Sequence, residues 1–206
     1  MALAATDDDG LFLIFAGCRR QSRHEGQLSA AMAGDAEILA ARIDALLPQT
    51  QCRRCGFDAC RPYAEALARG ETALNRCPPG GAALIDELAA LLDRPAMPLD
   101  PSCGLETPPR VAWIDEPACI GCARCIEPRP TDAIVGARKR MHTVIAADCN
   151  GCELCVPACP VDCIHMIPAP GLPAEPLPRA AVAERARHFR RRFDAHVARL
   201  AREHDG

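Results

Sequence analysis

The sequence predicts an α+β chain in which a small helical module is followed by a domain of short strands and a C-terminal helix. Three observations predict it. The cysteines gather in two separate sets, within residues 52–77 and 119–159. The second set contains an internal repeat with short apolar segments around it. Finally, aromatic residues make up only 3% of the chain, against 14 cysteines and 19 prolines, so we expect small units stabilised by bound ligands.

The first predicted element is a helix. Residues 1–34 show no clear period, and Cys18 stands alone among them without an assigned role. From Asp35, apolar residues recur at intervals of three and four, which predicts a helix that Pro48 ends. Its apolar positions are Ile38, Leu39, Ile43, Leu46 and Leu47.

The first cysteine set follows this helix. It consists of Cys52, Cys55, Cys60 and, after a short helix predicted over Pro62–Ala68, Cys77. Four thiolates at this spacing predict a closed four-ligand site. Zinc is one candidate, because sites of four cysteines with C-x2-C spacing commonly hold zinc. The cysteine repeat that follows favours a [4Fe-4S] cluster instead.

A second apolar period, at Leu84, Ile85, Leu88, Leu91 and Leu92, predicts a helix over Gly80–Leu92. Residues 94–110 are rich in proline and are expected to form an extended linker. Cys103 lies in this linker without local partners and receives no role.

The second cysteine set is a repeat. Cys119, Cys122 and Cys125 recur thirty positions later as Cys149, Cys152 and Cys155, and Cys159 and Pro160 complete the second copy. The second copy reads C-x2-C-x2-C-x3-C-P, the spacing of bacterial ferredoxins, in which the fourth cysteine ligates the other of two clusters. Short strands are predicted over Val111–Asp115, Asp132–Val135 and His142–Ile145. Gly121 and Gly151 are expected to let the backbone approach the cluster sulfides.

This exchange of ligands specifies one complete [4Fe-4S] site, formed by Cys119, Cys122, Cys125 and Cys159. The other site has Cys149, Cys152 and Cys155, but Arg129 occupies the position of its fourth cysteine. Arginine stays protonated and is a poor metal ligand. A labile cluster, a [3Fe-4S] cluster and no cluster at all therefore remain open for this third site. Cys163 could complete it only through an altered loop, and its repeat mate Ala133 favours a small buried residue.

A disulfide-stabilised secreted protein is the competing explanation of so many cysteines. The N-terminus has no basic start, and the apolar run over residues 11–16 is shorter than a signal core or a membrane span. We therefore expect a soluble, cytoplasmic chain with reduced thiols. The formal net charge of −3 gives no indication of a nucleic-acid partner.

After a second proline-rich linker over residues 169–178, residues Arg179–His204 predict a basic amphipathic helix. Its apolar face consists of Val182, Ala186, Phe189, Phe193, Val197 and Leu200. Packing against the protein or a partner is the ordinary explanation of such a helix. Peripheral binding to an anionic membrane surface and binding to nucleic acid are the alternatives.

Residues 38–168 closely resemble the B subunit of the Rnf/Rsx electron transport complex. The resemblance rests on the segments LPQTQC (47–52), CGF (55–57) with Cys60, YAEA (63–66), NRCPPGG (75–81) and KRMHTVI (139–145). It implies an iron-sulfur module followed by a two-cluster ferredoxin domain. It also implies a role in an inner-membrane complex that couples NADH and ferredoxin redox chemistry to ion movement, or that keeps a redox-sensing regulator reduced. Two departures from the family pattern are Arg129 and the expected lack of an N-terminal membrane helix.

The resulting organisation has six segments. They are an N-terminal extension (1–34), a four-cysteine iron-sulfur module (35–93), a linker (94–110), a ferredoxin-like domain (111–168), a second linker (169–178) and a C-terminal helix (179–206).

We expect electron transfer by a subunit of an Rnf/Rsx-type complex at the cytoplasmic face of the inner membrane, with the other subunits as partners. A free ferredoxin-like carrier for a cytosolic oxidoreductase and a non-redox metal-binding module are the alternatives. No nucleophile, acid-base pair or nucleotide loop is evident, so we expect no catalytic residue and no small-molecule substrate.

Overall fold

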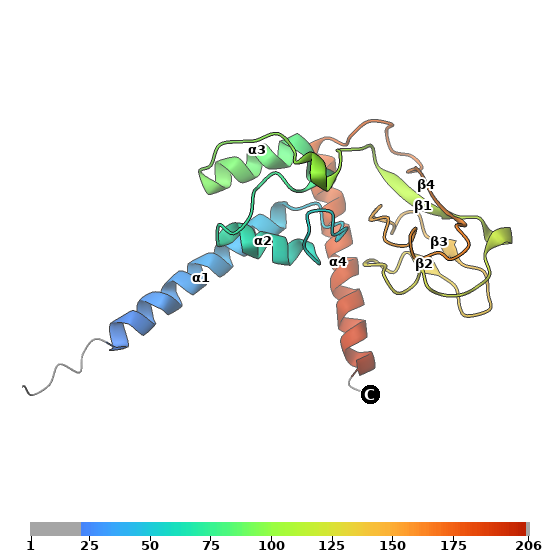
Figure 1. Ribbon diagram of the computed structural model, residues 1–206, viewed down its shortest axis with the longest axis horizontal. Coiled ribbons are helices and arrows are strands. Elements are labelled where there is room, and N and C mark those ends of the chain that lie inside the picture. The colour runs from blue at the N-terminus through green and yellow to red at the C-terminus, as the bar shows by residue number, and fades with distance from the viewer. Residues whose placement is uncertain (1–21, 205–206) are drawn as a thin grey trace, which may run out of the picture. The chain divides into compact units, whose positions relative to one another are not determined.

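The structure, a computed structural model, describes residues 22–204, so Cys18 lies outside the described residues. Helices and two small sheets make up its regular elements (Figure 1). The chain divides into one unit of residues 1–35 and a second of residues 36–206. All candidate site residues belong to the second unit.

Helix α1 spans Ser22–Leu46 and ends just before Pro48, as predicted. Its start was predicted wrongly, because the helix begins at Ser22 and residues 22–34 are therefore not irregular. The stretch SRHEGQLSAAMAG contains helix-forming alanines but lacks the apolar period on which the prediction relied.

The four-cysteine module is built around the end of α1 and two further helices, α2 (Cys60–Ala68) and α3 (Gly81–Leu92). A 3-10 turn over Pro78–Gly80 leads into α3. The predicted helices over 62–68 and 80–92 are thus confirmed to within two residues. Their apolar faces meet in a core whose fully buried members are Ile43, Leu47, Leu67, Leu84 and Leu88. Tyr63 is also buried, and its hydroxyl donates to the carbonyl of Ala73 at 3.0 Å.

The linker after α3 packs along the module. The Asp100 N–H donates to the Asn75 carbonyl at 2.9 Å, and the Ala82 N–H donates to the Glu106 carboxylate at 3.3 Å. A 3-10 turn over Pro101–Cys103 interrupts the expected extended run and buries Cys103. The linker is therefore held to the module by hydrogen bonds over part of its length.

Two antiparallel pairs of strands form the domain that carries the cysteine repeat. β1 (Arg110–Ile114) pairs with β4 (Ile164–Pro168), and β2 (Ile134–Val135) pairs with β3 (Thr143–Val144). The three strands predicted at 111–115, 132–135 and 142–145 are present with shifted or shorter bounds. β4 was not predicted, because its pairing with β1 joins the two ends of the domain and leaves no local pattern.

The thirty-residue repeat is also a repeat of backbone conformation. Asp115 N–H donates to the Cys163 carbonyl at 2.8 Å, and its repeat mate Ile145 donates to Ala133 at 2.7 Å. Positive φ angles recur in the same way, at Ala123 and Glu153 and at Asp132 and Asp162. The two halves therefore fold alike, with each half supplying hydrogen bonds to the other.

Gly121 and Gly151 occupy equivalent places in this repeat, with φ of 68° and 71°. A Cβ at Gly121 would lie 2.7 Å from the backbone of Arg140, and one at Gly151 would lie 2.6 Å from the carbonyl oxygen of Arg110. We expected these glycines to allow a close approach to cluster sulfides. The structure shows a second reason, because each cysteine loop passes too close to a neighbouring backbone for any side chain.

Helix α4 spans Arg179–His204, the range that the sequence predicts for the C-terminal helix (red in Figure 1). Its predicted apolar face is buried only in the N-terminal half, at Ala186 and Phe189. Farther along, Val197 is 48% exposed, while His196 is buried in its place. The buried side chains of the helix are therefore apolar in its N-terminal half, and the buried side chain farther along is polar.

The arginines of α4 pair with acids of the chain itself. Arg179 lies 2.8 Å from Glu87 of α3, and Arg190 forms an ion pair with Asp44 of α1. Farther along, Arg192 lies 3.1 Å from Asp148 in the cysteine-repeat domain. Packing against the protein, one of the roles considered for this helix, is thus the arrangement observed.

Candidate iron-sulfur sites

The four cysteines of the module surround one enclosed space, which we call the module site. Cys60 begins α2, and Cys77 precedes the turn into α3, so the fold of the module returns Cys77 to the loop that carries the other two. Leu47, Tyr63 and Pro78 complete the walls of the space. The cysteines of the module site are Cys52, Cys55, Cys60 and Cys77.

Burial makes these thiols hard to ionise in the absence of a cation. It raises the pKa of Cys60 to about 12 and the pKa of Cys77 well above its ordinary range. Among the described residues, Arg53 is the one basic side chain that lines the module site. Three buried thiols and the half-buried Cys52 in such surroundings fit a group whose iron atoms stabilise the thiolates, so loading would release protons.

A chain of buried amides holds the loop before Cys52, and sequence reasoning missed it. The Gln49 amide donates to the carbonyl of Asp44 at 2.5 Å, and the Gln51 amide donates to Gln49 at 2.9 Å. The Gln51 oxygen then accepts from the N–H of Cys60 at 2.7 Å. Both glutamines adopt positive φ, at 56° and 52°. These contacts fix the backbone from which the first thiol projects.

In the cysteine-repeat domain, four cysteines line a second enclosed space, which we call the first-loop site. Its cysteines are Cys119, Cys122, Cys125 and Cys159. The structure thus brings together the set that the ligand exchange predicts, although the four come from both halves of the repeat. Burial would raise the pKa of Cys159, but hydrogen bonds from the N–H groups of Val161 and Cys163 lower it overall. Donors aimed at a sulfur are what a cluster ligand needs.

His142 and Cys163 also line the first-loop site, and neither was assigned to it from the sequence. The Nδ1 atom of His142 lies 3.4 Å from the Cys119 sulfur, and the ring is 1% exposed. The Cys163 sulfur lies 3.5 Å from that of Cys159. Cys163 therefore belongs to the wall of the first-loop site, and the structure gives no support to the idea that it completes the third site.

The third set, which we call the second-loop site, consists of Cys149, Cys152 and Cys155, all buried. Burial raises the pKa of Cys152 and of Cys155 to about 12. The Cys149 sulfur accepts a hydrogen bond from the N–H of Ala112 at 3.4 Å. The set has three thiols, and the fourth position of the ferredoxin pattern is held by Arg129.

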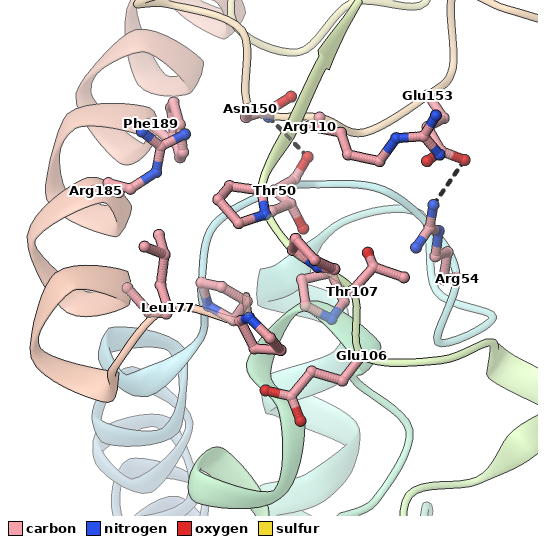
Figure 2. A pocket seen from close by; sticks show the side chains of 17 residues that line it. Thr50, Arg54, Glu106, Thr107, Arg110, Asn150, Glu153, Leu177, Arg185 and Phe189 are labelled. Atoms are coloured by element: carbon pink, nitrogen blue, oxygen red, sulfur yellow. Dashed lines mark hydrogen bonds and ion pairs between the residues drawn. The ribbon is translucent and has the colours of Figure 1, made fainter. Parts of the chain in front are cut away.

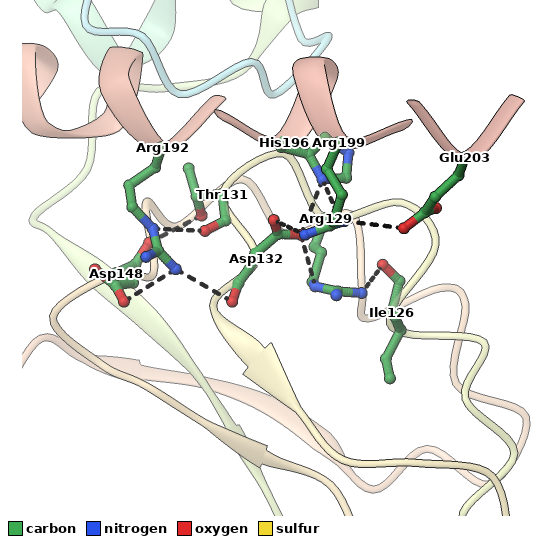
Figure 3. A network of polar contacts seen from close by, with 9 residues as sticks. All are labelled: Ile126, Arg129, Thr131, Asp132, Asp148, Arg192, His196, Arg199 and Glu203. Carbon is green, nitrogen blue, oxygen red and sulfur yellow. Dashed lines mark hydrogen bonds and ion pairs between the residues drawn. The ribbon is translucent and has the colours of Figure 1, made fainter. Parts of the chain in front are cut away.

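Figure 3 shows where the Arg129 side chain goes. It donates to the carbonyl of Ile126 and lies 3.3 Å from the carboxylate of Asp132. Asp132 in turn accepts from Arg199 at 2.9 Å and lies 2.9 Å from the ring of His196, both on α4. Burial would raise the pKa of Asp132, but these hydrogen bonds from α4 lower it overall. Arg129 is thus part of the contact between α4 and the domain.

In the part of the chain that the structure describes, no three Cys, His, Asp or Glu side chains are placed to hold one metal ion together. The thiols of the module site and of the first-loop site instead line the walls of a space. A [4Fe-4S] cluster takes one thiolate at each of its four irons, so these two sets fit it in number and arrangement.

Comparisons with known proteins match both cysteine regions. A family model for a 4Fe-4S dicluster domain matches residues 112–166, and a model described as a putative Fe-S cluster matches residues 47–79. No solved structure is matched. None of the helices in residues 22–204 is long and apolar enough to cross a membrane.

Three curated relatives are named as the B subunit of an ion-translocating oxidoreductase complex. The protein from Alkalilimnicola ehrlichii is 56% identical over 152 residues, which cover 71% of this chain and 81% of the relative. The relative from Hahella chejuensis is 54% identical, with 63% of this chain and 65% of the relative covered. The relative from Thiobacillus denitrificans is 57% identical, with coverages of 52% and 57%. The chain therefore belongs to the family of B subunits of the ion-translocating oxidoreductase complex.

Proposed function

We propose that this chain transfers electrons through bound [4Fe-4S] clusters as the B subunit of an ion-translocating oxidoreductase complex. The observation that carries the proposal is that two sets of four buried or half-buried cysteines each surround one space. Membership of the B-subunit family supports the assembly into a complex of several subunits. The proposal places the chain at the cytoplasmic face of the membrane, with the other subunits as partners.

The cofactor, when bound, accepts and releases single electrons. The residues of the chain hold it and set its potential through hydrogen bonds, charge and exposure. We infer that Cys52, Cys55, Cys60 and Cys77 bind one cluster and that Cys119, Cys122, Cys125 and Cys159 bind another. His142 faces the first-loop site with Nδ1 beside the Cys119 sulfur. Because a ligating thiolate has no proton to give, His142 is the donor in that contact.

The second-loop site is left incomplete in this proposal. Cys149, Cys152 and Cys155 can hold three corners of a cluster, and Arg129 occupies the position of the fourth ligand in the ferredoxin pattern. Arg129 would bring a positive charge near any cluster that assembles, which favours the reduced form. Two filled sites and a third whose occupancy depends on position 129 are therefore expected.

The half-buried arginines of α4 point toward the protein, so the proposal does not rely on this helix for membrane contact. Arg190, Arg192 and Arg199 pair with acids of the same chain. Association with the membrane is instead proposed to follow from assembly with the other subunits. This distinguishes the complex subunit from a free carrier, which would need no such assembly.

The test is purification of the full chain without oxygen, followed by assay of iron, sulfide and zinc. We expect about eight iron and eight sulfide per chain from the two complete sites, and a reducible EPR signal. A colourless, iron-free and folded protein, or one that holds zinc, would overturn the proposal. Co-purification with membrane subunits is expected, and recovery with a soluble oxidoreductase alone would favour the free carrier.

A further inference from the structure

Two polar contacts join the four-cysteine module to the loop of the second-loop site. The side-chain amide of Asn150 donates to the carbonyl of Thr50 at 2.8 Å. The Arg54 guanidinium lies 2.7 Å from the carboxylate of Glu153. Figure 2 shows both contacts, with Thr50 and Arg54 on the segment after α1 and Asn150 and Glu153 on the loop opposite.

These contacts bracket two of the candidate ligands. Cys52 lies between Thr50 and Arg54 in the sequence, and Cys152 lies between Asn150 and Glu153. A chain segment that is held on both sides of a cysteine keeps that cysteine beside the opposite segment. The loop of Cys52 and the loop of Cys152 are therefore neighbours.

Asn150 is suited to this role because it is buried and contacts both segments. Its side chain is 8% exposed, and its oxygen accepts from the N–H of Cys152 at 3.3 Å while its nitrogen reaches Thr50. A buried amide with both ends satisfied fixes the geometry more strictly than a surface pair does. The Arg54–Glu153 pair is partly exposed, with side chains 26% and 37% accessible.

The first loop makes no comparable contact. Among the hydrogen bonds and ion pairs of residues 36–204, none connects the module with residues 119–145. The two contacts with the module are therefore made by only one half of the repeat, although both halves share the same backbone conformation. This asymmetry cannot come from the repeat itself, so it comes from Asn150 and Glu153, whose repeat mates are Ile120 and Ala123.

We propose that Asn150 and the Arg54–Glu153 pair dock the module on the second loop and so place the second-loop site between the two complete sites. The functional meaning of this order rests on the proposed electron transfer. The module site then faces the ferredoxin-like domain through the one site that lacks a fourth cysteine. The residue at position 129 would then decide whether the middle one of the three sites, rather than one at either end, holds a cluster.

The docking is tested by hydrogen-deuterium exchange of the full, cluster-loaded chain under nitrogen. Arg54→Glu places like charges together and should raise exchange about two-fold or more in residues 50–55 and in residues 149–155. Asn150→Ala should do the same. The double variant Arg54→Glu with Glu153→Arg should return exchange to the original level. As a matched control, Arg69→Glu breaks the exposed Arg69–Glu71 pair within the module and should leave residues 149–155 unchanged.

Unchanged exchange of residues 149–155 in Arg54→Glu, or a rise confined to residues 119–125, would overturn the docking. A second measurement uses EPR in the Arg129→Cys background. There Arg54→Glu should alter the signal of the second-loop site and leave that of the first-loop site as it was. An effect on the first-loop signal alone would refute the order of sites. A protein without clusters would instead overturn the proposed function, while the exchange experiment on it would still report the docking.

Discussion

Replacing Arg129 with cysteine should complete the second-loop site. The substitution restores the x3 spacing that Cys159 has in the other half of the repeat. The new thiol would come from the first half of the repeat and complete the site in the second half. Cys159 does the opposite, because it comes from the second half and completes the site in the first. We expect a gain of about four iron and four sulfide per chain, with a second ferredoxin-type EPR signal.

The substitution should destabilise the chain without clusters and stabilise the chain with clusters bound. Arg129 is only 14% exposed at its side chain and contributes an ion pair to Asp132 and a hydrogen bond to Ile126. Asp132 keeps Arg199 and His196 after the substitution, so no carboxylate is left without a partner. Loss of the remaining contacts should cost the unloaded chain about 1–2 kcal/mol. The loaded chain should instead gain stability, because binding energy of a metal group adds to folding energy.

The measurements are iron and sulfide content, EPR, and thermal unfolding of the loaded and the unloaded protein under nitrogen. Arg124→Cys is the matched control, since Arg124 is exposed in the same loop and its repeat mate is Leu154, outside the ligand pattern. Arg129→Ala removes the arginine without adding a thiol. Equal iron content and identical spectra in Arg129→Cys and the original chain would refute the ligand assignment, as would an equal gain in Arg124→Cys.

Three further predictions address the loops and the helix contact. Gly121→Ala should destabilise the loaded protein by about 2–4 kcal/mol, measured by thermal unfolding, because the added Cβ meets backbone atoms. The control is Gly171→Ala, which has a similar φ but open space around it and should cost about 1 kcal/mol or less. His142→Leu should lower the reduction potential of the first-loop site, since a donor to the Cys119 sulfur is lost, and redox titration that finds an unchanged potential would contradict this. Finally, the pKa of Asp132 is lowered in the folded chain, so its contribution to stability is present above the unfolded pKa of about 4 and is lost as pH falls through the lower folded value. Asp132→Asn should destabilise the chain by about 1–3 kcal/mol at pH 7 and flatten that acid-side decline, measured by thermal unfolding between pH 3 and 7.

Local patterns in the sequence predicted the helices well, and the structure brings the thiols of two of the three predicted sets around one space each. The period of apolar residues gave α3 to within one residue, and Arg179–His204 was predicted with both bounds. Cys159 was assigned to the first-loop site across a sequence distance of more than thirty residues, because the ferredoxin spacing carries that long-range information. The structure places its sulfur at that site.

Contacts that depend on the tertiary arrangement could not be predicted in this way. His142 has no local partner in the sequence, yet the β2–β3 turn places it against Cys119. The amides of Gln49 and Gln51 occupy a short polar segment that resembles an ordinary loop, and their burial depends on the tertiary structure. The repeat could have located β4, since the offset of thirty from Ile134 points to Ile164.

The position of α4 bears on why one half of the repeat lacks a ligand cysteine. Asp132 and Asp162 are repeat mates with the same positive φ, but Asp132 lies under α4 while Asp162 is exposed. His196 and Arg199 of α4 contact the aspartate of the first half, and the residue three positions before this aspartate is Arg129, where the other half has Cys159. Arg129 and Arg199 of α4 both reach the carboxylate of Asp132, so the ligand position and the helix contact compete for one small region. A cysteine at position 129 can therefore be a ligand only if α4 stays packed on the domain without the arginine. Arg199 and His196 contact Asp132 independently of Arg129, so these contacts remain after the substitution.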